Sequence, residues 1–388
     1  MPPRKGTQPW SPLAVWFIRL LFLVLVVNAL WLWLGKDGTL LQHAFYTTTS
    51  KKTVVRQRIS SNRTSRLPVF NNCCRGNTDS LSVAIQKMNS SQWRFNKTAI
   101  DIFRRDLLEI SHFHEYFTAT KKNSPLNSLM YFFEKNKKVR IPVSGPVWFR
   151  LPKELPFSKD DRFNTCAVVG NSGILKNSKC SNRIDSSDLV IRCNFAPVDG
   201  NYTEDVGRKT GLMTLNPSIL IHTYKWLLMR RDQDRFLRDM GHYGNALVYT
   251  NPFHFREVTD IVIKADLLAR HRHARQKLYF SHPTYLEGVT EFWRRRNVTE
   301  RRLSTGLFLT SAALALCSQV QLYGFWPFST DRQGSTIPYH YYDKSSINSM
   351  VHNISEEFGH LLQLYREGIV NITTHPCESH PNSSKLSA

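Results

Sequence analysis

The ten residues Cys166–Leu175, CAVVGNSGIL, decide the fold of this 388-residue chain. Four apolar residues lead straight into the turn Gly170-Asn171-Ser172-Gly173, which is the pattern of a buried strand entering a tight loop. Glycine accepts positive φ, so such a loop can bring backbone N–H groups and an Asn amide against a nucleotide. An ordinary strand and turn is the alternative interpretation, because the segment lacks the full dinucleotide-binding fingerprint.

The sequence downstream alternates between short apolar runs and helical stretches. Strands are expected at Cys166–Gly170, Leu189–Asn194, Leu212–Leu215, Ala246–Tyr249 and Gln321–Phe325. Helices are expected over residues 223–240, 257–275, 305–317 and 355–367, and residues 73–140 are expected to be mainly helical. Alternation of this kind predicts an α/β body with three layers around a mostly parallel sheet.

The N-terminal region contains one long apolar run, residues 13–34, whose single charge is Arg19. As a helix the run would be about 33 Å long, enough to cross a hydrocarbon core of about 30 Å. Arg4 and Lys5 precede it and favour a cytoplasmic N-terminus. A cleavable signal peptide is the rival interpretation, but its apolar region would be shorter and would end in small residues, whereas this one ends LWLWL. We therefore expect a type II transmembrane signal-anchor.

This interpretation divides the chain into a cytoplasmic tail at 1–12, a transmembrane signal-anchor at 13–34, a stem at 35–75 and a lumenal body at 76–388. A net charge of +22 would by itself suggest nucleic acid, an anionic membrane or an acidic small substrate as partner. A lumenal protein meets no nucleic acid, so that partner is excluded. The hydrophobic content of 41% excludes wholesale disorder, collagen and coiled coil.

Two further counts agree with a lumenal body. Asn-X-Ser/Thr acceptors for N-glycosylation occur at Asn62, Asn89, Asn96, Asn201, Asn297, Asn353, Asn371 and Asn382. The seven cysteines would lie in a compartment that permits disulfides. No Cys-X2-Cys pair occurs, so no zinc pattern fits, and the odd number leaves at least one thiol free or bridged to another chain.

The segment Arg302–Cys317, RLSTGLFLTSAALALC, starts with a capping serine and continues as an apolar helix. Ser304 is expected at the N-cap, with Thr305 and Gly306 in the first turn. The first-turn amides, the two hydroxyls and the bare glycine form a natural seat for a phosphate. A capped core helix that binds nothing is the commoner outcome of such a sequence.

Two aromatic clusters and one histidine complete the candidate chemistry. The clusters are Tyr323–Phe328, YGFWPF, and Tyr339–Asp343, YHYYD, whose rings can stack on a base or sugar or simply pack as a corner. His340, in the second cluster, can donate to a phosphate or a glycan. His352 lies in a loop before a helix that we expect Ser355 to cap. A loop histidine is more often solvated than catalytic.

Taken together, in this order and spacing, the segments resemble the four sialyl motifs of animal sialyltransferases over about two-thirds of the chain. The long, short, third and very short motifs correspond to Cys166–Leu220, Arg302–Phe328, His340–Asp343 and His352–Glu357. The FWPF and HYYD sequences are similar to the alpha-2,8-sialyltransferase branch. Residues 123–126 and 292–302 look more like its ganglioside and O-glycan members than its polymerising members.

The resemblance implies a single GT-A-like variant of the Rossmann-type sheet in a Golgi membrane enzyme. Such an enzyme uses CMP-sialic acid as donor, inverts the anomeric carbon, needs no metal or other cofactor, and acts on a sialylated glycolipid or glycoprotein. By this resemblance Asn171 and Asn194 would hold the CMP part of the donor. Ser304, Thr305 and Gly306 would hold its phosphate.

The resemblance also assigns the remaining catalytic groups. Trp326, Tyr339 and His340 would close the donor site. His352 would be the general base that takes the proton from the acceptor hydroxyl. An imidazole with an unperturbed pKa of about 6.5 suits this role in a slightly acidic Golgi lumen.

Four of the cysteines allow three pairings, and the resemblance selects Cys166–Cys317 and Cys180–Cys377. Cys193 lies in an expected strand and is interpreted as a buried free thiol. Cys73 and Cys74 are adjacent and do not easily bond to each other, so one of them is a candidate link between two chains of a homodimer.

Three features of the sequence allow more than one interpretation. Asn353 forms a glycosylation acceptor beside His352, and a glycan there would crowd the acceptor, so we expect Asn353 to be unmodified. The basic region 256–302 would suit a polysialyltransferase that tracks a long polyanionic product, although a solvated basic face is the preferred interpretation. A catalytically inactive sialoglycan-binding protein is the remaining alternative, and the presence of His340 and His352 argues against it.

Overall fold

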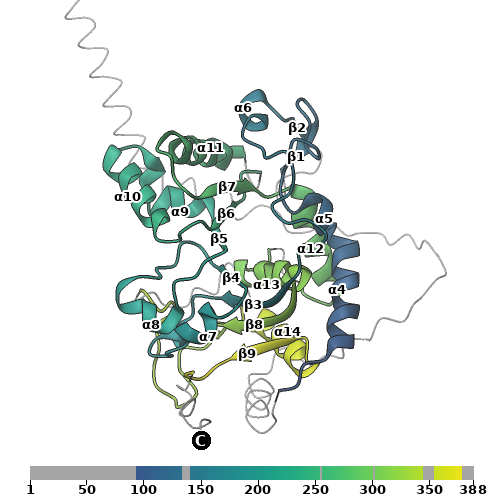
Figure 1. Ribbon diagram of the computed structural model, residues 1–388, viewed down its shortest axis with the longest axis vertical. Coiled ribbons are helices and arrows are strands. Elements are labelled where there is room, and N and C mark those ends of the chain that lie inside the picture. The colour runs from purple at the N-terminus through teal and green to yellow at the C-terminus, as the bar shows by residue number, and fades with distance from the viewer. Residues whose placement is uncertain (1–92, 133–139, 254–255, 300–301, 344–353, 378–388) are drawn as a thin grey trace, which may run out of the picture. The chain divides into compact units, whose positions relative to one another are not determined.

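A computed structural model describes residues 93–132, 140–253, 256–299, 302–343 and 354–377 (Figure 1). All of these belong to one compact unit, Pro68–Ala388. The expected tail, signal-anchor and stem lie outside the described residues, as do His352, Asn353 and the Cys73-Cys74 pair. No helix within the described ranges is long and apolar enough to cross a membrane. The membrane anchor therefore stays a prediction.

The core of the described unit is a seven-stranded sheet in which every neighbouring pair of strands is parallel. The strands are β3 (Phe163–Val169), β4 (Leu189–Arg192), β5 (Leu212–Leu215), β6 (Leu247–Thr250), β7 (Lys277–Phe280), β8 (Cys317–Tyr323) and β9 (Val370–Thr373). Their spatial order is β7-β6-β5-β4-β3-β8-β9, which runs from top to bottom in Figure 1. Every residue of β4 and β5 is buried, as expected for strands covered on both faces.

The chain reverses its direction across the sheet between β3 and β8. From β3 it winds outward to β7, and it then returns to place β8 on the other side of β3. The register pairs Val169 with Tyr323, and the Gly170 N–H donates to the Tyr323 carbonyl oxygen at 2.7 Å. Doubly wound sheets bind their ligands at the carboxyl edge of the strands, beside such a switch point.

Helices cover both faces of the sheet (Figure 1). One face packs against α4 (Lys97–Ser111), α12 (Pro283–Arg294), α13 (Thr305–Leu316) and α14 (Ile354–Arg366). The other packs against α7 (Ser181–Asp185), α8 (Thr203–Val206), α9 (Pro217–His222), α10 (Arg230–Gly241) and α11 (Arg256–His271). The expected three-layer α/β architecture with a parallel sheet is confirmed.

Helix α13 is almost completely enclosed, with nine of its twelve residues buried. Its buried hydroxyl groups are satisfied within the helix, because Thr310 donates to the Gly306 carbonyl oxygen and Ser311 to that of Leu307, both at 2.9 Å. The indole of Trp293 on α12 donates to Ser311 Oγ at 2.8 Å. These contacts fix the helix, and with it the position of its N-terminus at the carboxyl edge of the sheet.

Shorter elements complete the described part of the chain. They are α5 (Phe113–Tyr116), α6 (Gly145–Trp148), an antiparallel hairpin of β1 (Leu129–Tyr131) and β2 (Arg140–Pro142), and the 3₁₀ turns η1 (Gly173–Leu175), η2 (Gly200–Tyr202) and η3 (Lys225–Leu227). The hairpin corrects the expectation that helix dominates up to residue 140.

Two other expectations are wrong in detail. Residues 223–240 do not form one helix, because η3 contains three successive residues with φ between 48° and 60°, which separates α9 from α10. The helix expected over 305–317 ends at Leu316, where the pairing of Cys317 with Phe163 starts β8 earlier than expected. The edge strands β7 and β9 were not expected at all.

Both expected disulfides are formed. Cys166–Cys317 joins β3 to the start of β8, with Cα atoms 5.9 Å apart. Cys180–Cys377 joins the start of α7 to the last described residue of the chain, with Cα atoms 4.9 Å apart. Cys193 is a buried free thiol, as expected, and burial raises its pKa to about 12.

Candidate active site

A pocket of about 920 Å³, including its solvent-open mouth, lies at the switch point of the sheet. Its walls are the loops that follow β3, β4, β5 and β8, the first turn of α13 and the start of α14. It brings together all the expected donor-binding residues: Asn171, Asn194, Ser304, Thr305, Gly306, Trp326, Tyr339 and His340. Its mixture of polar and aromatic lining residues suits a nucleotide.

The turn after β3 lies directly against the turn after β8. A Cβ atom at Gly170 would sit 2.5 Å from the Gly324 carbonyl oxygen, which is closer than such atoms can approach. Gly324 itself has a φ of 70°. Both positions therefore require glycine, and the close approach places Asn171 at the pocket wall.

The two polar atoms of the Asn171 side-chain amide differ in their hydrogen bonding. Its Nδ2 lies 3.5 Å from the Cys193 carbonyl oxygen and 3.4 Å from the Tyr342 hydroxyl. Its Oδ1 is buried and has no hydrogen-bond partner among the residues that the structure describes. A buried acceptor without a partner costs about 1–3 kcal/mol, so this atom would bind an N–H or O–H group of a ligand favourably.

Asn194 follows β4 in a left-handed conformation, with φ at 55°. Its backbone N–H donates to Thr214 Oγ1 at 2.9 Å, and the Thr214 hydroxyl donates back to Asn194 Oδ1 at 3.1 Å. Because Oδ1 is engaged in this way, the amide Nδ2 is the group with which Asn194 can donate to a ligand.

The N-terminus of α13 is held by contacts from three segments. Ser304 Oγ accepts the Leu307 N–H at 3.1 Å, which confirms Ser304 as the N-cap. Glu357, in the first turn of α14, accepts the Ser304 N–H through Oε1 at 2.7 Å. Asn216, which follows β5, donates through Nδ2 to Thr305 Oγ1 at 3.3 Å. The helix end is therefore fixed relative to both the sheet and α14.

Gly306 leaves the first turn of α13 bare where it faces the pocket. A Cβ atom here would lie 2.9 Å from Cε1 of Phe325, so even an alanine would crowd the wall. First-turn amides of a helix have no intrahelical acceptor, and the helix dipole makes this end attractive to anions. This end of the helix, the phosphate seat, can therefore accept an anionic group.

His340 is oriented by a neighbouring carboxylate. Its Nδ1 lies 2.7 Å from Asp343 Oδ2, and its ring stacks on Tyr342 with centroids 5.1 Å apart and planes at 8°. An ionised carboxylate only accepts, so Nδ1 holds the proton and Nε2 is left for a ligand. The Tyr341 N–H donates to the Asn171 carbonyl oxygen at 2.9 Å, which ties this loop to the turn after β3.

Trp326 and Tyr339 complete the pocket wall in different ways. Trp326 is 8% exposed, and its indole N–H donates to the Thr330 carbonyl oxygen at 2.7 Å. Its ring packs edge-on against Phe328 and Phe358, so it forms a fixed wall. Tyr339 is half-buried, and burial raises the pKa of its hydroxyl, which therefore stays protonated and able to donate.

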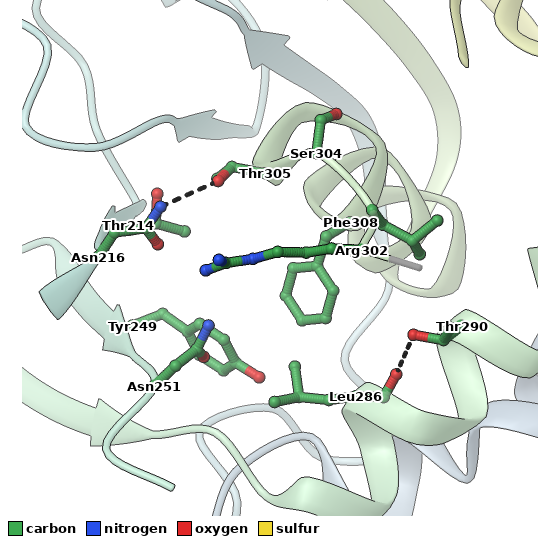
Figure 2. Close-up of a pocket in the computed structure, with 11 residues that line it drawn as sticks. Thr214, Asn216, Tyr249, Asn251, Leu286, Thr290, Arg302, Ser304, Thr305 and Phe308 are labelled. Carbon is green, nitrogen blue, oxygen red and sulfur yellow. Dashed lines mark hydrogen bonds between the residues drawn. The ribbon is translucent and has the colours of Figure 1, made fainter. Parts of the chain in front are cut away.

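A second pocket, of about 650 Å³ with its open mouth, adjoins the first (Figure 2). Asn216, Ser304 and Thr305 line both pockets. The other residues that line it are Thr214, Tyr249, Asn251, Leu286, Thr290, Arg302, Leu303 and Phe308. Sequence reasoning missed this group because its members come from β5, β6, α12 and the start of α13. The available signal was the polar residue after each of two neighbouring strands, Asn216 after β5 and Asn251 after β6.

The remaining expected residues have mixed placements. Asn96, Asn201 and Asn297 are exposed, and Asn371 is half-buried in β9, whereas Asn62 and Asn89 lie outside the described residues. Their glycosylation stays a prediction. Within the described ranges, no group of three or more His, Cys, Asp and Glu side chains is placed to hold a metal ion.

A family model described as glycosyltransferase family 29 (sialyltransferase) matches residues 118–369, well over half of the chain. The chain belongs to this sialyltransferase family. The matched range contains both pockets and all four segments that resemble sialyl motifs.

Relatives of this sialyltransferase carry alpha-2,8-sialyltransferase names. Mouse alpha-2,8-sialyltransferase 8F is 35% identical over 329 residues, which cover 85% of this chain and 82% of that protein. The human protein of the same name is 38% identical over 294 residues, 76% of this chain and 73% of its own. The alpha-N-acetylneuraminide alpha-2,8-sialyltransferase of Xenopus tropicalis is 37% identical over 293 residues, 76% of this chain and 84% of its own. The relatives thus lie in the branch that the FWPF and HYYD sequences indicate.

A crystal structure of a mammalian sialyltransferase covers 77% of this chain and 86% of its own, with 22% identity and a TM-score of 0.39. This similarity is too low to support a residue-by-residue comparison. The family membership depends on the family model and on the sequence relatives.

Proposed function

We propose that this sialyltransferase transfers sialic acid from CMP-sialic acid to a terminal sialic acid of a glycolipid or glycoprotein, in alpha-2,8 linkage. The observation that carries the proposal is one pocket in which the phosphate seat of α13 meets Asn171 and Asn194. These groups fit a nucleoside monophosphate, and the names of the relatives supply the linkage. The apolar run at 13–34 and the glycosylation acceptors support a Golgi membrane enzyme with a lumenal body.

The donor would occupy the first pocket with its phosphate at the first turn of α13. The free Oδ1 of Asn171 can accept a hydroxyl or amino hydrogen of the nucleoside. The Nδ2 of Asn194 can donate to one of its oxygen atoms. Preorganised donors of this kind hold the charge of a phosphate without a cation, which agrees with the proposed metal independence.

In the proposed reaction the acceptor hydroxyl at C8 attacks the anomeric carbon of the donor as the bond from that carbon to the phosphate oxygen breaks. The electron pair of the broken bond leaves with CMP, so negative charge increases on its phosphate. The amides of α13 would stabilise this charge, and so would His340 in its imidazolium form, in which Nε2–H donates to the phosphate while Nδ1–H stays on Asp343. Attack from the face opposite the leaving group inverts the anomeric carbon. The hydroxyl proton goes to His352 as general base.

Chain connectivity supports this assignment of His352. Ile354, the first residue of α14, and Glu357 both line the donor pocket. His352 precedes Ile354 by two residues in the sequence. His352→Ala should abolish transfer while CMP binding, measured by calorimetry, is unchanged.

Transfer by the detergent-solubilised full chain tests the proposal. The enzyme would be incubated with CMP-sialic acid and with a sialylated glycolipid, a sialylated O-glycoprotein or the desialylated form of each. Transfer that requires pre-existing sialic acid supports the proposal, and the better acceptor identifies the subclass. Transfer only to the desialylated forms would contradict it. Binding of CMP with no transfer to any acceptor would favour the sialoglycan-binding alternative.

Some basic side chains of residues 256–302 are paired with carboxylates, which supports the interpretation as a solvated basic face over the track of a polysialyltransferase. Within the described part of residues 256–302, Arg270 pairs with Asp266 at 2.8 Å, and both Arg294 and Arg295 pair with Glu291. Such pairs reduce the positive potential that would attract a polyanion. We therefore propose that the product gains one or a few sialic acids.

A further inference from the structure

The second pocket, here called the Arg302 pocket, has no role in holding the donor as proposed above. It is separated from the donor pocket by a shared wall of Asn216, Ser304 and Thr305. Thr305 lies in the first turn of α13, beside the phosphate seat. A molecule bound in the Arg302 pocket is therefore adjacent to the position of the bond that breaks.

Arg302 is the only charged residue among the eleven described residues that line the Arg302 pocket. Figure 2 shows its side chain extended along the ring of Phe308, with the guanidinium directed towards Asn216 and Asn251. A guanidinium carries its N–H donors in a planar fork that matches a carboxylate. The pocket is thus suited to an organic anion.

The other walls suit a sugar. The rings of Tyr249 and Phe308 lie with centroids 5.7 Å apart, and Leu286 adds an apolar surface beside them. Asn251 Oδ1 is buried and has no hydrogen-bond partner among the described residues. Apolar surface can cover a sugar ring face or an acetyl methyl group, and the Asn251 oxygen can accept from a hydroxyl or an amide N–H.

We propose that the Arg302 pocket binds the terminal sialic acid of the acceptor, with Arg302 pairing with its carboxylate and Asn251 accepting from one of its hydroxyl or amide groups. This inference rests on the proposed function, in which the acceptor itself ends in sialic acid. Arg302 then determines specificity, because a desialylated acceptor offers no carboxylate to the guanidinium.

A sialic acid carboxylate has two sources in this reaction, the acceptor and the donor. The acceptor is favoured because the groups proposed to hold the donor, Asn171, Asn194 and Gly306, line the first pocket and not the Arg302 pocket. Steady-state kinetics separate the two sources, since loss of an acceptor contact raises the KM for acceptor and loss of a donor contact raises the KM for CMP-sialic acid.

The test compares full-length wild type with Arg302→Gln, Arg302→Lys and the control Arg295→Gln. Arg295 is an exposed arginine of the same region that pairs with Glu291 at 2.8 Å and does not line either pocket. Arg302→Gln should raise the KM for a sialylated acceptor by about 10- to 100-fold, the usual effect of losing a charge-assisted hydrogen bond. The KM of Arg302→Lys for this acceptor should lie between those of wild type and Arg302→Gln, because an ammonium keeps the positive charge but lacks the planar fork of N–H donors. The KM for CMP-sialic acid should stay within twofold.

A second readout uses an acceptor whose carboxylate is converted to the methyl ester. Wild type and Arg295→Gln should discriminate strongly against the ester, whereas Arg302→Gln should use acid and ester almost equally. Undiminished discrimination by Arg302→Gln, or a rise confined to the KM for the donor, would overturn the inference. Failure of the proposed function gives a different result from failure of this inference, because wild type would then transfer sialic acid equally well to a desialylated acceptor.

Discussion

Glu357 joins the first turn of α14 to the N-terminus of α13, and its replacement should disturb the phosphate seat. Its Oε1 accepts the Ser304 N–H at 2.7 Å, and the side chain is 3% exposed. A hydrogen bond to a charged group contributes about 1.5–3 kcal/mol and one between neutral groups about 0.5–1.5 kcal/mol. Glu357→Gln keeps an acceptor oxygen but loses the charge, so the expected loss is about 1–1.5 kcal/mol.

The weaker hydrogen bond between residue 357 and the Ser304 N–H should displace the first-turn amides of α13 that hold the donor phosphate. If the whole of the expected loss, about 1–1.5 kcal/mol, comes from transition-state binding, kcat/KM for CMP-sialic acid falls by about 5- to 12-fold. Glu356→Gln is the matched control, since Glu356 lies in the same turn of α14 but contacts the Thr299 hydroxyl, at 3.4 Å. Glu356→Gln, like Glu357→Gln, removes a negative charge from the first turn of α14, so both variants lose the same interaction with the dipole of that helix. Kinetics with varied donor at saturating acceptor compare the two variants, and equal values would refute the role given to Glu357.

Three further predictions follow from single contacts. Gly306→Ala should raise the KM for CMP-sialic acid about tenfold in steady-state kinetics, since the new methyl group crowds Phe325 and the phosphate seat; an unchanged KM would count against a phosphate there. Burial lowers the pKa of His282 to about 4, and its neutral ring accepts the Thr284 N–H. As the pH drops from about 6.5 to 4, the unfolded chain binds a proton that the folded chain does not, so the free energy of unfolding should fall by roughly 3 kcal/mol. His282→Asn keeps an acceptor for the Thr284 N–H but does not titrate, so its free energy of unfolding, measured with denaturant, should fall less over this pH range than that of wild type, and an equal fall would contradict this. Cys193, with a pKa raised to about 12 by burial, should react with a thiol reagent only after unfolding, and rapid labelling of the native protein would contradict its placement.

The central strands of the fold could be predicted because each is a short apolar run next to a turn. The edge strand β9 is only four residues long and half of its pattern is polar, VNIT, so no comparable signal existed. The break between α9 and α10 was missed because η3 places Lys225, Trp226 and Leu227 in a conformation that sequences usually mark with glycine. Tertiary packing, rather than local preference, decides that turn.

The donor pocket could be predicted more fully than its neighbour. Its residues lie in compact segments with recognisable chemistry, such as the capped helix at Ser304 and the glycine turn before Asn171. The Arg302 pocket draws its residues from several elements, and only the parallel order of β5 and β6 brings Asn216 and Asn251 to one edge. The contact between Glu357 and Ser304 joins residues 53 positions apart and likewise has no local signature.

The linkage and configuration of the product distinguish an inverting alpha-2,8-transferase from every alternative. Nuclear magnetic resonance of the glycan formed by the full-length enzyme from CMP-sialic acid and a sialylated acceptor identifies both the attacked hydroxyl and the new anomer. We expect sialic acid joined through C8 of the acceptor sialic acid in the alpha configuration, inverted relative to the donor. A product in which the new sialic acid is attached to galactose, or in which the donor configuration is retained, would contradict it.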